Sequence, residues 1–205
     1  MKITDSYRNI LSFIDKVVNG KDFSFQHSNR KLLAATLFDI ANEHGKAINT
    51  LFEEKLDASG FSMMRIQFET FVRACWLLNC ATDSEIEKFT KNDNLLADDK
   101  RNLEFGTILR EVESKLDLGS TLTEIKKSSW TALNSYTHGG LHQAARRFNG
   151  LTIEQHHDPE QVDECVKFSA MLTFLGFCQM VDICENGQLD KETLELYESI
   201  KGLVF

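Results

Sequence analysis

The chain has 205 residues and a formal net charge of −8, with 42% hydrophobic and 26% charged residues. This balance is typical of a soluble globular protein and excludes a wholly disordered chain. The acidic surplus disfavours broad nucleic-acid binding, because phosphate backbones are held by clustered lysine and arginine. A single proline and the lack of long alternating β-branched runs favour helices.

We expect a reduced, cytoplasmic protein with no membrane-spanning segment. The five cysteines contain no CxxC pair, and three of them lie in apolar runs, where free cysteine behaves as a small hydrophobic residue. The first residues lack the apolar core of a signal peptide. The longest apolar run, residues 168–181, is too short to cross a bilayer and predicts a buried core helix.

The chain begins with a predicted helix that Thr4 or Asp5 caps. Its apolar residues recur at helical spacing up to an Asn-Gly pair, which is a typical stop signal. The loop that follows carries Phe23 and Phe25, and we expect both rings to fold back onto the rest of the protein.

A long helix from about Asn29 to Asp57 comes next, and the Ala-Ser-Gly sequence at 58–60 is predicted to break it. Pro159 opens the last core helix, and Asp190 caps a final amphipathic one. Between these, apolar spacing predicts helices over residues 61–80, 83–90, 98–116, 121–136 and 141–148. The sequence therefore predicts one all-α domain over residues 1–205, a bundle of about seven or eight helices.

The bundle is organised around residues 61–80, which are apolar on nearly every side of a helix and are therefore expected to be central. One narrow polar stripe interrupts the apolar surface. At about 100° per residue, the stripe consists of Ser62, Arg65, Glu69, Arg73 and Trp76. Its charged members need partners, because unpaired buried charge is very costly.

Two interpretations of this stripe stay open. Glu69 is four residues from both Arg65 and Arg73, so one carboxylate can bridge two guanidinium groups. The three side chains then form an architectural ion network. Alternatively, the arginines offer forked donors in a pocket for an anionic or amide-bearing ligand.

A second polar cluster occupies residues 134–140, with the sequence NSYTHGG, and continues to Gln143. The double glycine permits a sharp turn, after which the next helix presents its N-terminal amides, which favour anions. His138 is placed where an imidazole can meet Glu69. A role as a helix cap, with the ring hydrogen-bonded in the core, is equally compatible with the sequence.

We expect neither a metal nor a cofactor. His138 and His142 have i,i+4 spacing, but the two glycines between them interrupt the helix. No HExxH motif and no Cys/His set with zinc spacing occurs. The chain also lacks a GxSxG motif and the Walker and Rossmann glycine patterns.

The segments RIQFETFVRACWLLNCATD (65–83) and WTALNSYTHGGLHQAARR (130–147) resemble two signature blocks of a bacterial family of all-helical proteins of unassigned function. The shared pattern is Arg-x3-Glu-x3-Arg-x2-Trp-Leu, followed by Trp-x2-Leu-Asn-x-Tyr-Thr-His-Gly-Gly-x2-Gln. The resemblance implies no reaction. It implies one neighbourhood that contains Arg65, Glu69, Arg73, Trp76, Tyr136, His138 and Gln143.

More distantly, the chain resembles the HEPN superfamily, the helical-bundle nucleases of toxin and phage-defence systems. Their active site is an arginine followed by a histidine after four to six residues. None of the six histidines of this chain has an arginine at that distance before it. The resemblance therefore extends to the fold and not to the nuclease motif.

Three functional hypotheses follow. The absence of catalytic motifs favours a ligand-sensing or protein-interaction module in bacterial stress or phage defence, with a small anionic ligand or a protein as its partner. The second hypothesis is a metal-independent nuclease or phosphoryl-transfer enzyme that uses Glu69 and His138 together. The third is a purely structural ion network. The first helix and residues 190–203 are candidate faces for a homodimer.

Overall fold

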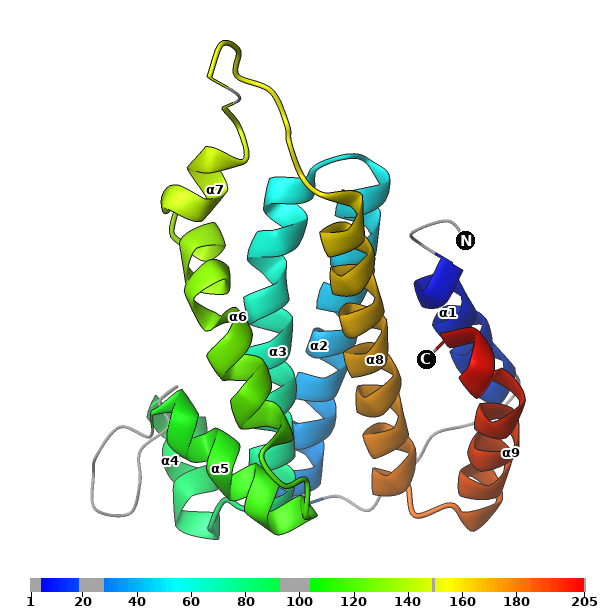
Figure 1. Cartoon of the computed structure of the whole chain (residues 1–205). Helices are drawn as coiled ribbons and strands as arrows, with labels where there is room; N and C mark the ends of the chain where they lie inside the picture. Colours follow the sequence, from blue (N-terminus) through cyan, green and yellow to red (C-terminus); the bar gives the residue numbers. More distant parts are fainter. Residues whose placement is uncertain (1–4, 19–27, 93–103, 149, 205) are drawn as a thin grey trace.

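A computed structural model describes residues 5–18, 28–92, 104–148 and 150–204, and all statements below refer to these ranges. They hold α-helices and no extended strand, which confirms the predicted all-α fold (Figure 1). The helices are α1 (Asp5–Val18), α2 (Asn29–Glu53), α3 (Asp57–Asn79), α4 (Asp83–Asn92), α5 (Phe105–Leu116), α6 (Thr121–Thr137), α7 (Leu141–Ala145), α8 (Pro159–Ile183) and α9 (Gly187–Val204).

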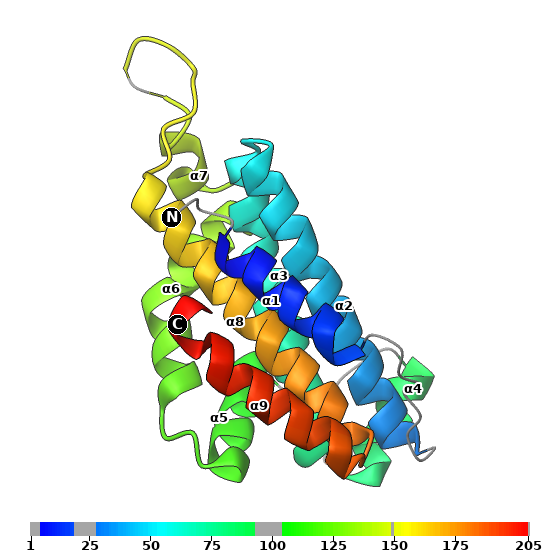
Figure 2. The same cartoon turned by 90° about the vertical axis from the view of Figure 1, so that its right-hand side faces the viewer.

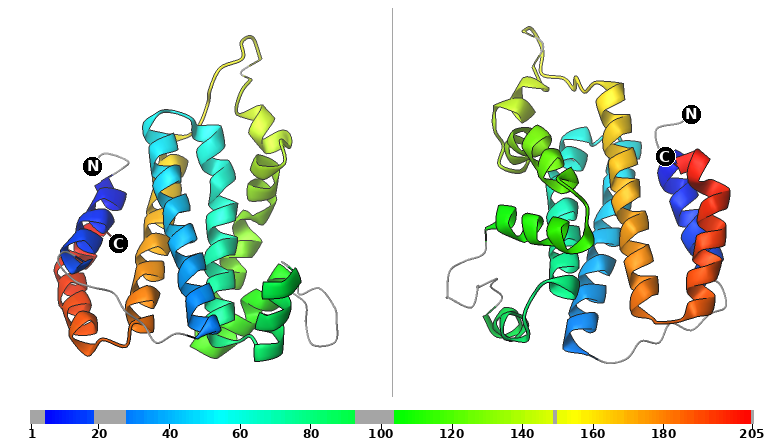
Figure 3. Two further views of the ribbon diagram at one scale, coloured as in Figure 1. Left: turned by 180° about the vertical axis from the view of Figure 1, so that it is seen from behind. Right: turned by 60° about the horizontal axis from the view of Figure 1, so that its bottom comes forward.

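Three long helices, α2, α3 and α8, run side by side and form the centre of the bundle (Figure 1). α6 packs against α3 on one side of this centre. On the other side, α1 and α9 lie together across α8 (Figure 2). α4 and α5 gather at one end of the bundle (Figure 3). The polar stripe of α3 therefore faces α6, and the opposite side of α3 faces α2 and α8.

α3 is the most enclosed helix, as its apolar sequence predicts. Phe68, Val72 and Leu77 are fully buried, and Trp76 is nearly so. Phe68 packs edge-on against Phe105 of α5 and also contacts α8. A helix that is apolar on most sides can bury these residues only by having neighbours on most sides. α2, α5, α6 and α8 supply those neighbours.

The predicted break between α2 and α3 is wrong by about one turn. α2 ends at Glu53, and the chain reverses at Lys55, whose φ of 59° is left-handed. Residues 58–60 lie inside the first turns of α3. Gly60 is buried there, and a Cβ at this position would meet the Phe52 ring at 2.9 Å. This glycine serves close helix packing and not a helix break.

The start of the last helix is also earlier than predicted. Oδ1 of Asn186 accepts hydrogen bonds from the amides of Gln188 (3.2 Å) and Leu189 (3.3 Å), so Asn186 caps α9 and Asp190 lies in its first turn. Phe23 and Phe25, which are predicted to fold back onto the protein, and the predicted start of the fifth helix at residue 98 lie outside the described residues.

Among the described helices, only α8 is long and apolar enough to cross a membrane. Its buried residues pack against α1, α2, α3 and α9. The core helix of a soluble protein meets the same criterion, and this packing agrees with the buried core helix that the sequence predicts.

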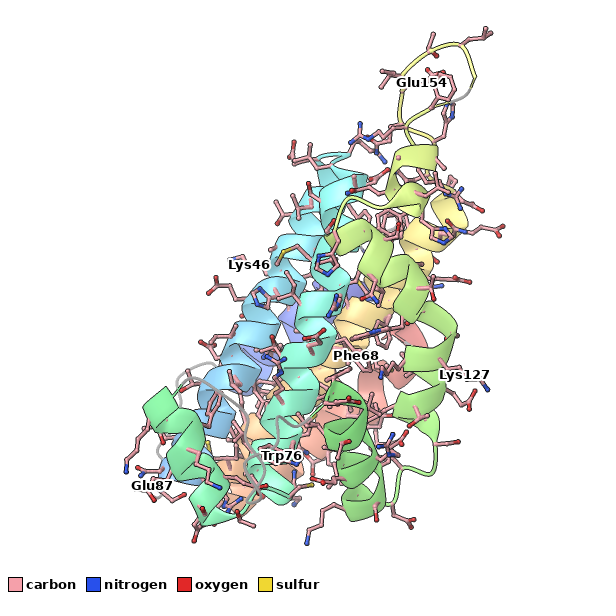
Figure 4. All side chains as sticks on the ribbon, turned by 90° about the vertical axis from the view of Figure 1, so that its left-hand side faces the viewer. Lys46, Phe68, Trp76, Glu87, Lys127 and Glu154 are labelled. Atoms are coloured by element: carbon pink, nitrogen blue, oxygen red, sulfur yellow. The ribbon has the colours of Figure 1, made fainter. Side chains whose placement is uncertain are left out.

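The segment between α7 and α8, of which residues 146–148 and 150–158 are described, projects beyond the helices at its tip and packs on α3 at its base through Gln155 and His157. An isolated antiparallel bridge joins Phe148 to Ile153 within it. Figure 1 shows it beyond the end of the bundle that is opposite α4 and α5. Figure 4 places Glu154 on this segment, while Trp76 lies towards the other end of α3. We call residues 146–158 the projecting segment.

Candidate functional site

The polar stripe of α3 opens into a surface pocket beside the C-terminal end of α6. The pocket has a volume of about 230 Å³. Arg65, Glu69 and Arg73 lie on its α3 side, and His138 lies opposite them. The remaining lining residues are Ile66, Thr70 and Thr137.

Glu69 holds both arginines. Its Oε1 accepts a hydrogen bond from Nε of Arg65 at 2.6 Å, and its Oε2 accepts one from Nη2 of Arg73 at 3.3 Å. The i,i+4 spacing places each guanidinium one helical turn from the carboxylate. The two arginines are therefore fixed by one acid, and the contact to Arg73 is the longer of the two.

Arg65 also contacts α6 at two points. Its Nη1 lies 3.0 Å from Nε2 of His138, and its guanidinium carbon lies 4.7 Å from the centre of the Trp130 ring. A guanidinium group can only donate hydrogen bonds. In this contact Nε2 of His138 is therefore the acceptor and Arg65 the donor.

The site is partly open. The side chains of Glu69, Arg65 and Arg73 are 17%, 23% and 44% exposed, and His138 is exposed. An architectural ion network in a dry interior would be closed to solvent. Here the acid is the most shielded member, and the outer arginine reaches water.

The turn after α6 is built as the double glycine predicts. His138 ends the helix, Gly139 has a φ of 67°, and the amide of Gly140 donates to the carbonyl of Ser135 at 2.7 Å. A Cβ at Gly140 would lie 2.6 Å from Oγ of Ser135. That same Oγ accepts from the amide of His142 and so caps α7. Small residues here let the chain reverse and leave the His138 ring facing α3.

Two of the predicted site residues, Tyr136 and Gln143, do not line the pocket. Tyr136 is buried and stacks on Phe61 with ring centres 4.8 Å apart. Burial raises the pKa of Tyr136, against smaller lowering contributions from Arg146. Gln143 approaches Oγ of Ser62 at 3.5 Å. Tyr136 ties the end of α6 to the start of α3, and Gln143 ties α7 to it, so both residues hold the wall of the pocket.

Trp76 lies apart from this group. Its indole Nε1 donates to Oε2 of Glu111 on α5 at 2.6 Å, and its ring is buried in the core. Helical spacing places Trp76 on the same line as Arg73, and the resemblance between sequence blocks implies that the two share one neighbourhood. Its hydrogen bond, however, belongs to the contact between α3 and α5.

Sequence reasoning missed the contribution of Lys126 and Trp130. Lys126 lies over the Trp130 ring at 5.3 Å, on the same helix one turn earlier. The Trp130 ring is stacked on Phe105 with ring centres 5.1 Å apart. A usable signal was present, because residues 126 and 130 are four apart on the helix that leads to His138 and must meet the stripe of α3.

The thiols offer no nucleophile at this site. Burial raises the pKa of Cys75, Cys165 and Cys178 to about 12, and thiol nucleophiles need the opposite shift. Within the described ranges, no group of three or more His, Cys, Asp or Glu side chains is arranged to hold a metal ion.

Residues 38–204 match the model of a family described as "Family of unknown function (DUF6988)". The chain belongs to this family. No curated protein and no solved structure matches the chain. The family match supports the resemblance to an uncharacterised family that the two sequence blocks carry, and it brings no known reaction.

The matched region contains the whole pocket. Every lining residue, from Arg65 on α3 to His138 after α6, lies between residues 38 and 204. α1 and the first turns of α2 precede the match. The helices that build the pocket are thus all part of the family region.

Proposed function

We propose that the pocket between α3 and α6 binds a small anion, such as a phosphate or carboxylate group, and that the chain works as a ligand-binding helical module. The observation that carries this proposal is Arg73. Its guanidinium is 44% exposed at the pocket and makes one contact of 3.3 Å to Glu69. It is held in place without being enclosed.

Hydrogen-bond capacity supports the proposal. Each guanidinium has five N–H donors in a planar fork that matches phosphate and carboxylate. The contacts above use two donor atoms of Arg65 and one of Arg73. Donors therefore remain for a ligand, and Glu69 reduces the entropy that the two arginines lose when they bind it.

Charge points in the same direction. The pocket combines two arginines with one glutamate, so it carries a local positive charge on a chain whose net charge is −8. The Trp130 ring beneath Arg65 adds a cation–π contact, which holds the guanidinium without neutralising it.

The test is calorimetric titration of the full chain with inorganic phosphate and, separately, with succinate. We expect saturable binding of at least one of them, and a loss of about tenfold or more in affinity in Arg73→Ala, because a charge-assisted hydrogen bond contributes about 1.5–3 kcal/mol. Arg8→Ala is the matched control, since Arg8 is an exposed arginine of α1 that pairs with Glu53 at the end of α2, outside the pocket.

No binding of either anion, or equal binding by the wild type and Arg73→Ala, rejects the proposal. Loss of binding in Arg8→Ala as well would assign the effect to overall charge. Binding that Arg73→Ala removes and Arg8→Ala keeps supports the pocket.

A second candidate is metal-independent cleavage of RNA in the same pocket. The observation that favours it is the contact of 3.0 Å between Nη1 of Arg65 and Nε2 of His138. When Arg65 turns from Nε2 of His138 to a bound phosphate, the freed Nε2 can take the proton of a ribose 2′-hydroxyl. The 2′-oxygen then attacks phosphorus, the bond to the 5′-oxygen breaks, the leaving oxygen takes a proton from water, and the arginines stabilise the charge on the phosphate. Glu69 contacts both arginines, so its part in this chemistry is to position them.

The test is incubation of a single-stranded RNA oligonucleotide with the full chain in the presence of a metal chelator. Cleavage that is lost in His138→Ala and kept in His142→Ala supports this candidate, because His142 is an exposed neighbour outside the pocket. Intact RNA, or cleavage that survives His138→Ala, rejects it and leaves anion binding untouched.

A further inference from the structure

The projecting segment carries an unusual share of exposed apolar surface. Among the described residues, the most exposed large hydrophobic side chains are Leu151 (93%), Ile153 (84%) and Leu141 (81%). Phe148 is 59% exposed. Leu141 opens the neighbouring helix α7, and the other three belong to the segment. Contiguous exposed apolar side chains of this kind mark interaction sites.

Backbone hydrogen bonds within the segment hold these side chains in exposed positions. The amide of Glu154 donates to the carbonyl of Arg147 at 3.0 Å, and the amide of His156 donates to the carbonyl of Arg146 at 2.8 Å. Phe148 and Ile153 are bridge partners. Directly opposite residues of an antiparallel pair present their side chains on the same face, so these two form one apolar surface.

The charge of the segment differs from that of the chain. Residues 146–158 contain two arginines, Arg146 and Arg147, and two acids, Glu154 and Asp158, in a protein of net charge −8. Two copies of an acidic protein repel each other at most surfaces. A patch that has an apolar centre and equal numbers of positive and negative side chains around it avoids that repulsion.

The faces that the sequence suggests for a homodimer are already used within one chain. α1 and α9 pack against each other and against α8. Phe13 of α1 contacts Phe174 of α8, and Tyr197 of α9 stacks on the same Phe174. The buried apolar residues of these two helices therefore pack within one chain, while Leu11, Ile14 and Val18 of α1 line an open pocket of about 410 Å³.

We propose that the projecting segment is the contact between two copies of this chain, related by a two-fold axis, with Phe148, Leu151 and Ile153 of each copy covering those of the other. A two-fold contact uses the same patch on both copies, so a patch with balanced charge suits it. Each covered side chain removes on the order of 100 Å² from water. With the rim, two copies approach about 1,000 Å², the lower limit for a specific interface.

An interface of this size predicts a reversible dimer. The test is sedimentation equilibrium of the full chain over a range of concentrations, with Leu151→Asp/Ile153→Asp as the disrupting variant. Both positions are more than four-fifths exposed, so the substitutions leave the helices intact, which circular dichroism checks. We expect dimerisation to weaken by about 100-fold or more, because two apolar side chains leave the interface.

Leu194→Asp is the matched control. Leu194 is 61% exposed on α9, so Leu194→Asp places one negative charge, half that of the double variant, on the alternative face. Dimerisation that Leu194→Asp leaves unchanged and the double variant abolishes supports the proposal. A wild-type monomer throughout, or a dimer that only Leu194→Asp breaks, overturns it.

A lipid surface is the other chemistry that an apolar tip with arginines at its base would suit. Co-sedimentation with vesicles of phosphatidylcholine and phosphatidylserine separates the two. Vesicle binding by a monomeric wild type, weakened by salt and lost in Leu151→Asp/Ile153→Asp, overturns the dimer. A dimer that stays in solution and persists at high salt supports it.

Discussion

α3 carries polar side chains on two opposite sides, and solvent reaches only one of them. Towards α6, the side chains of Arg65, Glu69 and Arg73 are between 17% and 44% exposed. Towards α8, Gln67 is completely buried. Polar side chains on both sides form hydrogen bonds with neighbours, and access to solvent is the main difference between the two sides.

The Gln67 side is a closed network. Nε2 of Gln67 donates to the carbonyl of Ser169 at 3.1 Å and to Oγ1 of Thr173 at 3.2 Å. Thr173 is also hydrogen-bonded to Tyr7 of α1, and burial raises the pKa of that tyrosine. One buried amide thus links α3, α8 and α1. Oε1 of Gln67 and Oγ of Ser169 are buried without a hydrogen-bond partner.

The two sides of α3 serve different purposes: the buried side contributes to stability, and the side at the pocket can bind a ligand. A polar group enclosed by three helices can only be structural, because no ligand reaches it and its own hydrogen bonds are costly to lose. A polar group at a pocket loses less when it changes, because water replaces the lost partner. The same helix therefore offers two opposite substitutions, one that replaces an amide by a carboxylate and one that replaces a carboxylate by an amide.

The reciprocal pair Gln67→Glu and Glu69→Gln tests this difference with nearly equal changes in volume. Gln67→Glu puts a carboxylate against the Ser169 carbonyl in the dry interior, so we expect the free energy of unfolding to fall by about 3–5 kcal/mol. Glu69→Gln loses two partly exposed ion pairs, and we expect a loss of about 1 kcal/mol or less. Urea unfolding at neutral pH measures both.

A loss of several kcal/mol in Glu69→Gln would contradict this reading and favour the purely structural ion network. The same variant also reports on the site. Removing the acid leaves both guanidinium groups without their carboxylate, so anion affinity changes in Glu69→Gln and not in Gln67→Glu, as long as the latter remains folded.

Gly45 of α2 gives a second way to break the closed network. A Cβ at this position would lie 2.2 Å from Oγ1 of Thr173 and 2.7 Å from Nε2 of Gln67. In an ordinary helix Gly→Ala is stabilising by about 1 kcal/mol. Here we expect Gly45→Ala to be destabilising by about 2 kcal/mol, because overpacking displaces two hydrogen-bonded groups. The midpoint of urea unfolding measures it.

Gly187→Ala is the control, since Gly187 opens α9 and a Cβ there meets nothing within 4 Å. An unfolding midpoint that rises in Gly45→Ala as it does in Gly187→Ala would show that Thr173 and Gln67 adapt without loss.

Much of the fold follows from local signals in the sequence. The bounds of α1 and the start of α2 agree with the predicted ones, because caps and apolar spacing act within one or two turns. The break at Lys55 does not follow from such signals. A lysine with positive φ is uncommon, and the nearby Gly60 suggests a break that close packing against Phe52 explains instead.

The candidate site is also only partly predictable from the sequence. The i,i+4 spacing of Arg65, Glu69 and Arg73 on one helix is readable from the sequence, and so is the turn at Gly139. The contact of Arg65 with His138 and Trp130 depends on how α6 lies against α3, which is a property of tertiary packing. Gln67 looks in the sequence like any polar residue in an apolar helix, and only its neighbours on α8 show what it holds.

His157 extends the comparison to a buried group that titrates. Its ring stacks on Phe61 with ring centres 5.0 Å apart, and both ring nitrogens are buried without a hydrogen-bond partner. Burial lowers the pKa of His157; Asp57 opposes this shift, while Arg146 and Arg147 add to it. The folded protein therefore holds a neutral ring at a pH at which the unfolded chain binds a proton.

The sign of the pH effect follows. Below the ordinary histidine pKa of about 6.5, the unfolded state takes up a proton that the folded state does not, so the free energy of unfolding falls as the pH falls. We expect urea midpoints to drop between about pH 7.5 and pH 5, and to drop less in His157→Phe, which keeps the stacking on Phe61 and removes the titration. His44, whose pKa burial also lowers, accounts for part of the slope that remains. If the midpoint of urea unfolding changes equally with pH in the wild type and in His157→Phe, the His157 ring takes up its proton within the folded protein. The segment between α7 and α8 would then admit water as freely as the pocket does.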